Sequence, residues 1–501
     1  MLKPPIRSSI CSPHRTPPAT PAPPCCVKTR RQLLLAGIAD LTGNYPLTSS
    51  SHDLNEKSHQ IPRVMASVAE DPEQWACDGT GALSLRLARS KASSAQLSPS
   101  EQKLISSFHP RFVYPLFGKE ETIYGYQDLD IQVRLAFNSS TLKNYLSISY
   151  TAMLPASSGA KPDSIEEVIF KYIPPDYTKS EATFTADLES STTNQFIPPG
   201  KKISSYRSVP SKGKTKSEHF LTSKRWERCT SDQMEEEEEV IYELWAANWK
   251  TPGFREYHRR MQILVLLYIE GGSYIEEDDD RWEFVVLFER RKLKSADENT
   301  NPYSYHFCGY VSLYSFYHYP SSIRLRLSQF IVLPPYQSNG HGCESISMLY
   351  SQIFQYLLTR PEVAELTLED PSESFEDLRD REDLKLLIEH KVFDEKPLSE
   401  LIHVSSEWYE ATRRKWKFAS RQFARLLELV LRWKFTTVEE SGNEKSERLY
   451  RIKVKERLYR FNYDSLVDLS KEERREKLQD TFENVMDDYD RLLRGERREI
   501  D

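Results

Sequence analysis

A glycine-containing turn in the second half of the chain has residue types that suit a phosphate group. Residues 337–342 read QSNGHG and lie between an apolar run and a segment with helical periodicity. Glycines let the backbone approach a ligand closely, and the free N–H groups and dipole at a helix start favour a phosphate. The turn therefore suits a pyrophosphate-bearing cofactor. A plain tight turn accounts for the same pattern, and both the G-x-G-x-x-G of a dinucleotide site and the G-K-[ST] of a P-loop are absent.

Two adjacent carboxylates, Glu369 and Asp370, follow the next apolar run and precede Pro371. In a strand–helix–strand unit, the end of the second strand and the turn after the first strand face the same edge of the sheet. A carboxylate there could take a proton from a lysine ammonium, whose ordinary pKa is about 10.4, before the amine attacks a thioester. Burial that raises the carboxyl pKa towards ~7 would suit this role. Alternatively, both acids merely precede a proline turn and cap residues 372–380.

The elements that must position these residues can be read from the apolar spacing. We expect a strand over residues 324–333, an amphipathic helix over residues 343–357 and a short strand over residues 365–368. Together they make a βαβ-like unit. Upstream, residues 253–269 have the spacing of a helix. Further strands are expected over residues 240–245, 282–288 and 305–314.

The composition excludes several classes of protein. The chain has 501 residues, of which 39% are hydrophobic, so it can bury sizeable cores and is not disordered throughout. Its net charge of -7 argues against a globally basic nucleic-acid binder and suits a cationic partner. It has no apolar run of the ~20 residues that a membrane span needs. Seven scattered cysteines without a C-x-x-C pair indicate no zinc site and a reducing compartment, and we expect no metal.

The two ends of the chain differ from this middle part. Residues 1–63 are rich in Pro and Ser, are basic at their start and hold no acid before Asp40. A mitochondrial transit peptide, a disordered extension and a working start at Met65 all fit this composition, and we favour the disordered extension. Residues 196–231 are basic and polar, which predicts a long loop or insertion. We expect a disordered extension at 1–64, an N-terminal α/β domain at 65–235, a domain with the turn and the two acids at 236–390, and a mainly helical domain at 391–501.

These residues also resemble a known family. Residues 325–381 are similar to the GNAT superfamily of N-acetyltransferases, whose coenzyme signature is [QR]-x-x-G-x-[GA]. From about Asp71, the chain resembles the catalytic subunits of type B histone acetyltransferases. The matching stretches keep the family's order: YPLFG at 114–118, GY at 125–126, REYHRR at 255–260, DRW at 280–282, SQFIVLPPYQSNGHG at 328–342, EDPSESFEDLRDR at 369–381 and VKERLYRFNY at 454–463.

The resemblance implies an α+β fold, with a GNAT-type acetyltransferase core at 236–390, an N-terminal mixed α/β domain and a helical C-terminal domain. The implied reaction is direct acetyl transfer from acetyl-CoA to lysine side chains in the N-terminal tail of newly made histone H4, in a ternary complex. An acetyltransferase of the same superfamily that acts on another protein or a small amine is the first alternative. A non-enzymatic histone-binding module that has kept the fold is the second.

Roles at the reaction centre follow from the same resemblance. Glu369 matches the general base, and Asp370 is a second carboxylate that could replace it. Backbone N–H groups near Ile331 to Leu333 would stabilise the developing oxyanion. The residues that match coenzyme contacts are Phe330, Ile331, Val332, Gln337, Ser338, Asn339, Gly340, His341, Gly342, Cys343, Ser372 and Arg381.

The histone side carries over in the same way. Lys119, Glu120 and Glu121 match an acidic turn that contacts the tail, although a lysine at the first position departs from the pattern. Trp282 matches a tail-contacting aromatic residue and follows an acidic run at 276–280. A strand segment beside the peptide is matched by Tyr314, Ser315 and Phe316. Ordinary core packing is the alternative for Trp282 and Phe316.

Partners and location are implied by the resemblance alone. The implied partners are histone H4, with histone H3, and a WD40-repeat histone chaperone subunit. No membrane and no direct nucleic-acid contact are expected, and the implied location is the cytoplasm and nucleus. The basic segment 201–224 and the residues before Met65 have no counterpart in the pattern, so they receive no role.

Overall fold

The computed structural model describes residues 75–127, 132–155, 159–208, 226–228, 240–293, 301–337, 342–394, 398–437 and 444–495. The chain divides between residues 69 and 70, and every described residue belongs to the second unit, 70–501. The extension predicted at 1–64 therefore lies outside the described residues. Within them, no helix is long and apolar enough to cross a membrane.

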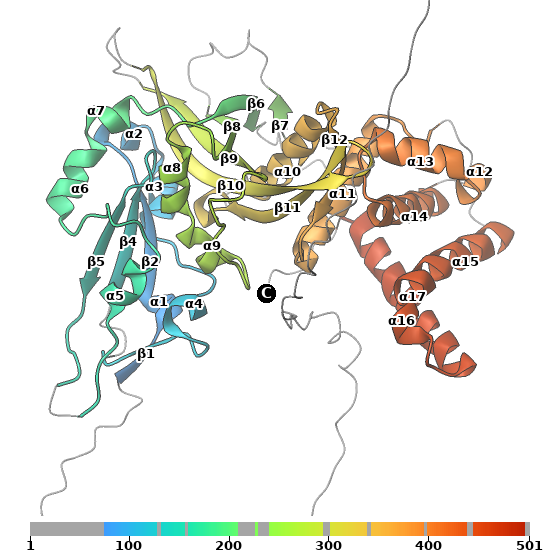
Figure 1. The fold of residues 1–501 in the computed structure, drawn as a ribbon, viewed down its shortest axis with the longest axis horizontal. Coiled ribbons are helices and arrows are strands. Elements are labelled where there is room, and N and C mark those ends of the chain that lie inside the picture. Colours follow the sequence, from blue (N-terminus) through green and yellow to red (C-terminus); the bar gives the residue numbers. More distant parts are fainter. Residues whose placement is uncertain are drawn as a thin grey trace, which may run out of the picture. The chain divides into compact units, whose positions relative to one another are not determined.

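The N-terminal part is built on a three-stranded sheet (Figure 1). Its order is β2 (Leu83–Ala88), β4 (Gln132–Asn138) and β5 (Asn144–Ser149), and β2 runs parallel to β4. A second, two-stranded sheet joins β1 (Ala76–Asp78) to β3 (Thr122–Tyr124). The helices of this part are α1 (Gly79–Ala82), α2 (Lys91–Ser94), α3 (Pro99–Ser106), α4 (Tyr114–Phe117), α5 (Ile165–Phe170), α6 (Glu181–Leu188) and α7 (Ser191–Asn194).

A seven-stranded sheet forms the centre of the second unit, in the order β12-β11-β10-β9-β8-β6-β7. Neighbouring strands are antiparallel except β11 and β12, which are parallel. The strands are β6 (Lys201–Ser208), β7 (Trp226–Arg228), β8 (Ile241–Asn248), β9 (Trp282–Lys292), β10 (Tyr303–His318), β11 (Ser322–Val332) and β12 (Val363–Leu368).

Helices cover both faces of this sheet. Tyr310 and Val311 follow each other on β10, so their side chains point to opposite faces. On the face of Tyr310, His258 of α8 (Phe254–Met261) lies 6.2 Å from the Tyr310 ring, and α9 (Ile263–Tyr268) follows α8. On the face of Val311, its strand partner Phe330 packs 4.9 Å from Phe375 of α11 (Glu373–Glu389). The helix α10 (Gly342–Leu358) contacts α11.

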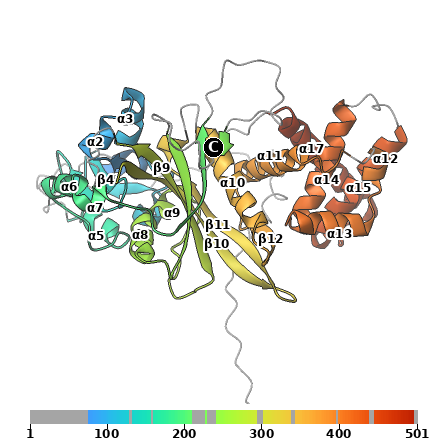
Figure 2. The same cartoon turned by 90° about the horizontal axis from the view of Figure 1, so that it is seen from above.

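The C-terminal part is helical, as expected. Its helices are α12 (Leu398–Ile402), α13 (Ser406–Lys415), α14 (Ser420–Thr437), α15 (Glu444–Phe461), α16 (Tyr463–Leu466) and α17 (Lys471–Leu493). A capping box of Ser470 and Glu473 begins α17. In Figures 1 and 2 these orange and red helices gather beyond β12, at the end of the large sheet away from β2, β4 and β5.

The predicted strands, the helix over 343–357 and the α+β class are confirmed in a mixed α/β fold. The prediction of a loop throughout residues 196–231 is wrong, because residues 201–208 form β6 between β8 and β7. Lys201 and Lys202 are exposed at the start of this strand, and Tyr206 is buried further along it. Pairing on both sides, rather than an apolar pattern, therefore determines the strand.

Candidate active site

The parallel strands β11 and β12 bring Glu369 next to Ser328. Leu327 pairs with Leu368, and the Glu369 N–H donates to the Leu327 carbonyl over 2.9 Å. The Ser328 hydroxyl then donates to the Glu369 carboxylate over 2.5 Å. Because β11, α10 and β12 follow one another in the chain, the predicted βαβ-like unit is confirmed.

A β-bulge explains why Ser328 points towards β12. On β10, Ser312 pairs with Gln329 and the next residue, Leu313, pairs with Leu327, so Ser328 is left without a partner on that strand. A bulge bends the strand and re-aims the side chain of the extra residue. The bulge thus leaves the Ser328 hydroxyl available to the carboxylate at the end of β12.

Beyond the bulge, β11 extends further than its parallel neighbour. The ladder with β12 ends at Leu327, while β11 continues to Val332, roughly 17 Å further at about 3.3 Å per residue. The Leu333 N–H donates to the Cys308 carbonyl over 2.9 Å, so it is already used within the sheet. Alternate residues direct their amide groups to opposite edges, and the amide of Val332 therefore faces the edge that β12 no longer covers.

The alternation of amide directions along β11 bears on the predicted oxyanion N–H groups and on the predicted coenzyme contacts. Leu333 is not available for an oxyanion, since its N–H is engaged by Cys308. Of the three residues predicted along the coenzyme, Ile331 and Val332 are buried, and Phe330 is half-buried against Phe375. Phe330 and Val332 are two residues apart on β11, so their backbone N–H and C=O groups point to the same edge of the strand, the one that β12 does not cover.

The glycine turn is only partly described. It is preceded by the short helix η5 (Pro334–Tyr336), and the Gln337 side chain amide donates to the Val332 carbonyl. Ser338, Asn339, Gly340 and His341 lie outside the described residues. Gly342 and Cys343 begin the backbone of α10, but their side chains lie outside the described part of the chain. The phosphate role of the turn stays a prediction.

The residues after β12 are exposed, contrary to one expectation. Glu369 and Asp370 are both exposed, so burial does not desolvate the Glu369 carboxylate here. Asp370 adopts a left-handed backbone conformation with φ of 33°. Ser372 caps α11, since its hydroxyl accepts from the Phe375 N–H over 3.3 Å. Arg381 is half-buried one turn beyond Asp377 and donates to the Asp377 carbonyl over 3.1 Å.

Three of the predicted histone-contacting residues form one aromatic cluster. Trp282 of β9 pairs with Tyr314 of β10, and their rings lie 4.8 Å apart, edge to face. The Tyr314 ring lies 4.7 Å from that of Phe316. All three side chains are half-buried, so their rings keep accessible surface rather than disappearing into the core.

Two arginines flank this aromatic cluster of Trp282, Tyr314 and Phe316. The Arg281 guanidinium lies 4.8 Å from the Tyr314 ring centre, and the Arg326 guanidinium lies 4.5 Å from that of Phe316. Both distances suit cation–π contacts. Arg281 is also paired with Asp279 at 2.7 Å. The cluster is therefore already in contact with cations at both ends.

Ser315 is separated from its predicted companions. Successive residues of a strand face opposite sides, and Ser315 donates to Glu283 over 3.2 Å on the face opposite to Tyr314 and Phe316. Glu283 in turn pairs with Arg360 at 2.5 Å. The structure thus brings Tyr314 and Phe316 together with Trp282. The Ser315 side chain instead lies on the other face of the sheet, where it contacts the Glu283–Arg360 ion pair.

The acidic run at 276–280 is largely neutralised by its own neighbours. Glu277 pairs with Arg259 at 2.6 Å, and Asp280 pairs with Lys250 at 3.2 Å. Hydrogen bonds from Arg281 hold the pKa of the Asp279 carboxyl well below its usual range. The remaining acids, Glu276 and Asp278, are exposed and form no ion pair with a described residue.

The predicted acidic turn has a structural task of its own. Lys119 and Glu120 are exposed. Glu121 has φ of 51°, and its carboxylate accepts from the Val113 and Tyr114 N–H groups over 2.6 and 2.9 Å. These N–H groups lie at the start of α4. The Glu121 carboxylate is therefore occupied at the helix start, which leaves Glu120 as the exposed acid of this turn.

Sequence reasoning missed the partner of the predicted base and a buried charged network. Ser328 lies inside a matched stretch but carries no motif of its own. Arg89 and Glu289 are both buried and paired at 2.5 Å, although 200 positions separate them. The available signal was weak: a glutamate directly after the apolar run 284–288 of β9. Among the described residues, no group of His, Cys, Asp or Glu could hold a metal ion.

Comparisons with known proteins identify the chain's relatives. Residues 75–270 match a family model described as "Histone acetyl transferase HAT1 N-terminus", and residues 380–435 match one described as "Fungal HAT1, C-terminal". The chain is 46% identical over 434 residues to a protein of Cryptococcus neoformans named "Histone acetyltransferase type B catalytic subunit", which covers 85% of this chain and 99% of that protein. Proteins of the same name from Mycosarcoma maydis and Candida albicans are 39% and 33% identical, over 77% and 85% of this chain and 82% and 92% of their own lengths.

Proposed function

The chain belongs to the family of histone acetyltransferase type B catalytic subunits, and from this premise we propose a specific reaction. The protein transfers the acetyl group of acetyl-CoA to lysine side chains in the N-terminal tail of newly synthesised histone H4. The observation that carries the proposal is the Ser328–Glu369 contact beside the uncovered edge of β11. This contact supports a reaction centre in which the base, Glu369, and the thioester of acetyl-CoA both lie at the same edge of β11.

The proposed core is of the GNAT type and spans residues 236–390. Its support is the parallel β11–β12 pair, whose ladder ends at Leu327 while β11 continues to Val332. The pantetheine arm of acetyl-CoA lies along the backbone of Phe330 and Val332, whose amide groups face that edge. The pyrophosphate lies at the turn 337–343, near the start of α10. Ser372 and Arg381 provide further coenzyme contacts.

The proton step falls to Glu369, with Asp370 as the second acceptor. A lysine ammonium with a pKa of about 10.4 must lose a proton before its nitrogen can attack. Glu369 accepts that proton, the amine forms a C–N bond to the acetyl carbonyl carbon, and the C–S bond breaks. The sulfur leaves as coenzyme A thiolate and takes up the second proton that the nitrogen loses as it becomes an amide. The Ser328 hydroxyl holds the carboxylate in place throughout.

The histone tail lies against Trp282, Tyr314 and Phe316. Their half-buried rings offer apolar contact, and exposed Glu276 and Asp278 offer negative charge to a Lys/Arg-rich peptide. In the proposed arrangement Ser315 contributes its backbone only. We further propose that the protein acts on histone H4 together with histone H3. It works with a WD40-repeat histone chaperone subunit and is active in both the cytoplasm and the nucleus.

A peptide panel tests the substrate. We expect the kcat/KM for an H4 tail peptide to exceed that for unrelated lysine peptides of equal charge by at least about tenfold, the equivalent of ~1.4 kcal/mol in transition-state binding. Equal rates across the panel would favour an acetyltransferase for other amines. Tail binding without acetyl transfer would favour a histone-binding module without activity.

A further inference from the structure

A buried polar triangle lies directly before the coenzyme turn. Its members are Arg89, which follows β2, Glu289 of β9 and Tyr336, the last residue of η5. Arg89 Nη2 donates to Glu289 Oε2 over 2.5 Å and to the Tyr336 hydroxyl over 3.0 Å. The Tyr336 hydroxyl donates to the same Glu289 oxygen over 3.1 Å. We call these three side chains the η5 clasp.

The η5 clasp is buried and strongly polarised. The side chains of Arg89 and Glu289 are each 1% exposed. Burial alone would raise the pKa of the Glu289 carboxyl, but the charges of Arg89 and Arg291 outweigh burial and lower the pKa to about 2. A hydrogen bond to an ionised partner in such surroundings is stronger than one between neutral groups. The hydrogen bonds of the Tyr336 hydroxyl with Arg89 and Glu289 therefore help to fix the position of η5.

Only one member of the clasp belongs to the segment that leads into the turn. Arg89 and Glu289 are anchored by the ends of β2 and by β9, and Glu289 is also held by Arg291. η5 itself is held locally by the Tyr336 N–H, which donates to the Leu333 carbonyl over 2.8 Å, and it packs against α3 and α10. Gln337 follows Tyr336 at once. A displacement of Tyr336 would therefore move the first residue of the coenzyme turn.

We propose that Tyr336 is a positioning residue for acetyl-CoA, held by Arg89 and Glu289 so that η5 delivers the turn in its binding-competent place. The inference rests on the proposed function, which assigns the coenzyme to β11 and the following turn. It adds that the N-terminal part of the protein, through Arg89, contributes to coenzyme affinity without touching the coenzyme. If η5 is in place only part of the time, the apparent affinity falls by that fraction.

The test is Tyr336→Phe, with Tyr206→Phe as the matched control. Phenylalanine keeps the ring in the core and removes only the hydroxyl from the clasp. Tyr206 is also buried, but its hydroxyl has no hydrogen-bond partner among the described residues. Calorimetry should give an acetyl-CoA Kd about tenfold weaker for Tyr336→Phe, the loss expected for one hydrogen bond to a charged group. The Kd of Tyr206→Phe should stay within twofold of wild type.

A second readout separates positioning from general stability. The KM for the histone tail peptide should change less than twofold in Tyr336→Phe, and the backbone amides of positions 336 and 337 should exchange hydrogen faster in this variant than in Tyr206→Phe. An unchanged acetyl-CoA Kd, an equal rise in the tail KM, or a variant that does not fold would each overturn the inference. Wild-type protein that binds no acetyl-CoA would instead contradict the proposed function, and the exchange rates would still decide whether the clasp holds η5.

Discussion

Ser328, the extra residue of the β11 bulge, donates its hydroxyl to Glu369 at the end of the neighbouring parallel strand over 2.5 Å. The contact fixes an otherwise exposed carboxylate at the point where the two strands separate. An exposed glutamate without such a partner samples several rotamers. In the proposed reaction, we attribute the placement of the Glu369 carboxylate to this single hydrogen bond rather than to burial.

Removing the hydroxyl tests that attribution. Ser328→Ala should lower kcat about tenfold, because a hydrogen bond to a charged group is worth about 1.5–3 kcal/mol and part of this loss falls on the reaction step. The Kd of acetyl-CoA should stay within twofold of wild type. Ser405→Ala, which removes the hydroxyl at the start of α13, is the control and should keep the wild-type kcat. A Ser328→Ala enzyme with unchanged kcat would separate the bulge from catalysis.

Gly309 sets how closely β10 and β11 approach at the proposed coenzyme segment, Phe330 to Val332. A Cβ atom at Gly309 would lie 2.1 Å from the Ile331 carbonyl oxygen and 2.9 Å from the Val332 Cα. Gly309→Ala should therefore push β11 outwards, lower the free energy of unfolding by roughly 1–3 kcal/mol and weaken acetyl-CoA binding. Thermal unfolding and calorimetry measure both effects.

The control for Gly309→Ala is Gly253→Ala. Gly253 has φ of 74° but open space around the added Cβ. We expect this variant to lose stability through backbone strain alone and to bind acetyl-CoA like wild type. Equal coenzyme affinity in both variants would show that the spacing of β10 and β11 does not govern the coenzyme segment.

Trp282 should affect the histone tail and not the coenzyme. Trp282→Ala removes the largest ring of the aromatic cluster, and we expect the KM for the H4 tail peptide to rise about tenfold, with the acetyl-CoA Kd unchanged. Tyr319→Ala removes an aromatic ring that is 81% exposed at the tip of the β10–β11 hairpin, and it should leave both constants within twofold. If the two variants behaved alike, the cluster would have no special part in tail binding.

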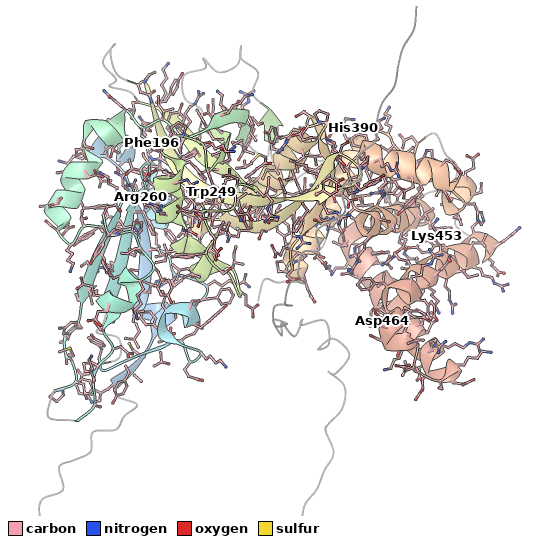
Figure 3. All side chains as sticks on the ribbon, in the orientation of Figure 1. Phe196, Trp249, Arg260, His390, Lys453 and Asp464 are labelled. Carbon is pink, nitrogen blue, oxygen red and sulfur yellow. The ribbon has the colours of Figure 1, made fainter. Side chains whose placement is uncertain are left out.

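His258 should make the fold sensitive to acid. Its ring lies 4.9 Å from Trp249, which is labelled in Figure 3, and 4.7 Å from Phe284, and neither ring nitrogen has a hydrogen-bond partner among the described residues. Burial, and secondarily the charge of Arg259, lowers the pKa of His258 from 6.5 to about 3. The His258 ring therefore becomes protonated near pH 6.5 in the unfolded chain but stays neutral at that pH in the folded chain.

Below pH 6.5 the unfolded state binds more protons than the folded state. The free energy of unfolding therefore decreases as the pH falls below 6.5. Between pH 6.5 and 4.5 this one group should cost roughly 2 kcal/mol. His258→Phe should remove that part of the pH dependence in urea unfolding, while His390→Phe, on the surface, should keep it. Equal slopes for wild type and His258→Phe would show that the buried ring does not cause the acid sensitivity.

The part of the site that the sequence predicts is the part with strong local patterns. The apolar runs of β11 and β12 and the spacing of α10 are local, and their order predicts the parallel pair. Strand periodicity also argues against Tyr314, Ser315 and Phe316 sharing a face, a consequence the family resemblance alone did not reveal. Whether Glu369 is buried depends on what packs over the end of β12, which no local pattern encodes.

Long-range polar contacts were not predictable. Arg89 follows a strand of the three-stranded sheet, whereas Glu289 belongs to the seven-stranded sheet, and neither residue has a neighbour in the sequence that indicates its partner. In the sequence, Tyr336 is marked only by the two prolines before it. Likewise β6 was missed because Lys201 and Lys202 suggest a loop, whereas pairing with β8 and β7 decides the backbone. Sequence patterns report local periodicity, while these features depend on tertiary packing.

The central claim is that Glu369 takes the lysine proton, and steady-state kinetics of Glu369→Gln on an H4 tail peptide test it most directly. Glutamine keeps the shape of the side chain and its contact with Ser328 but cannot accept the proton. We predict a kcat lower by on the order of 100-fold or more at neutral pH, an acetyl-CoA Kd within twofold of wild type, and a smaller loss for Asp370→Asn. A Glu369→Gln enzyme that turns over at the wild-type rate would contradict the account.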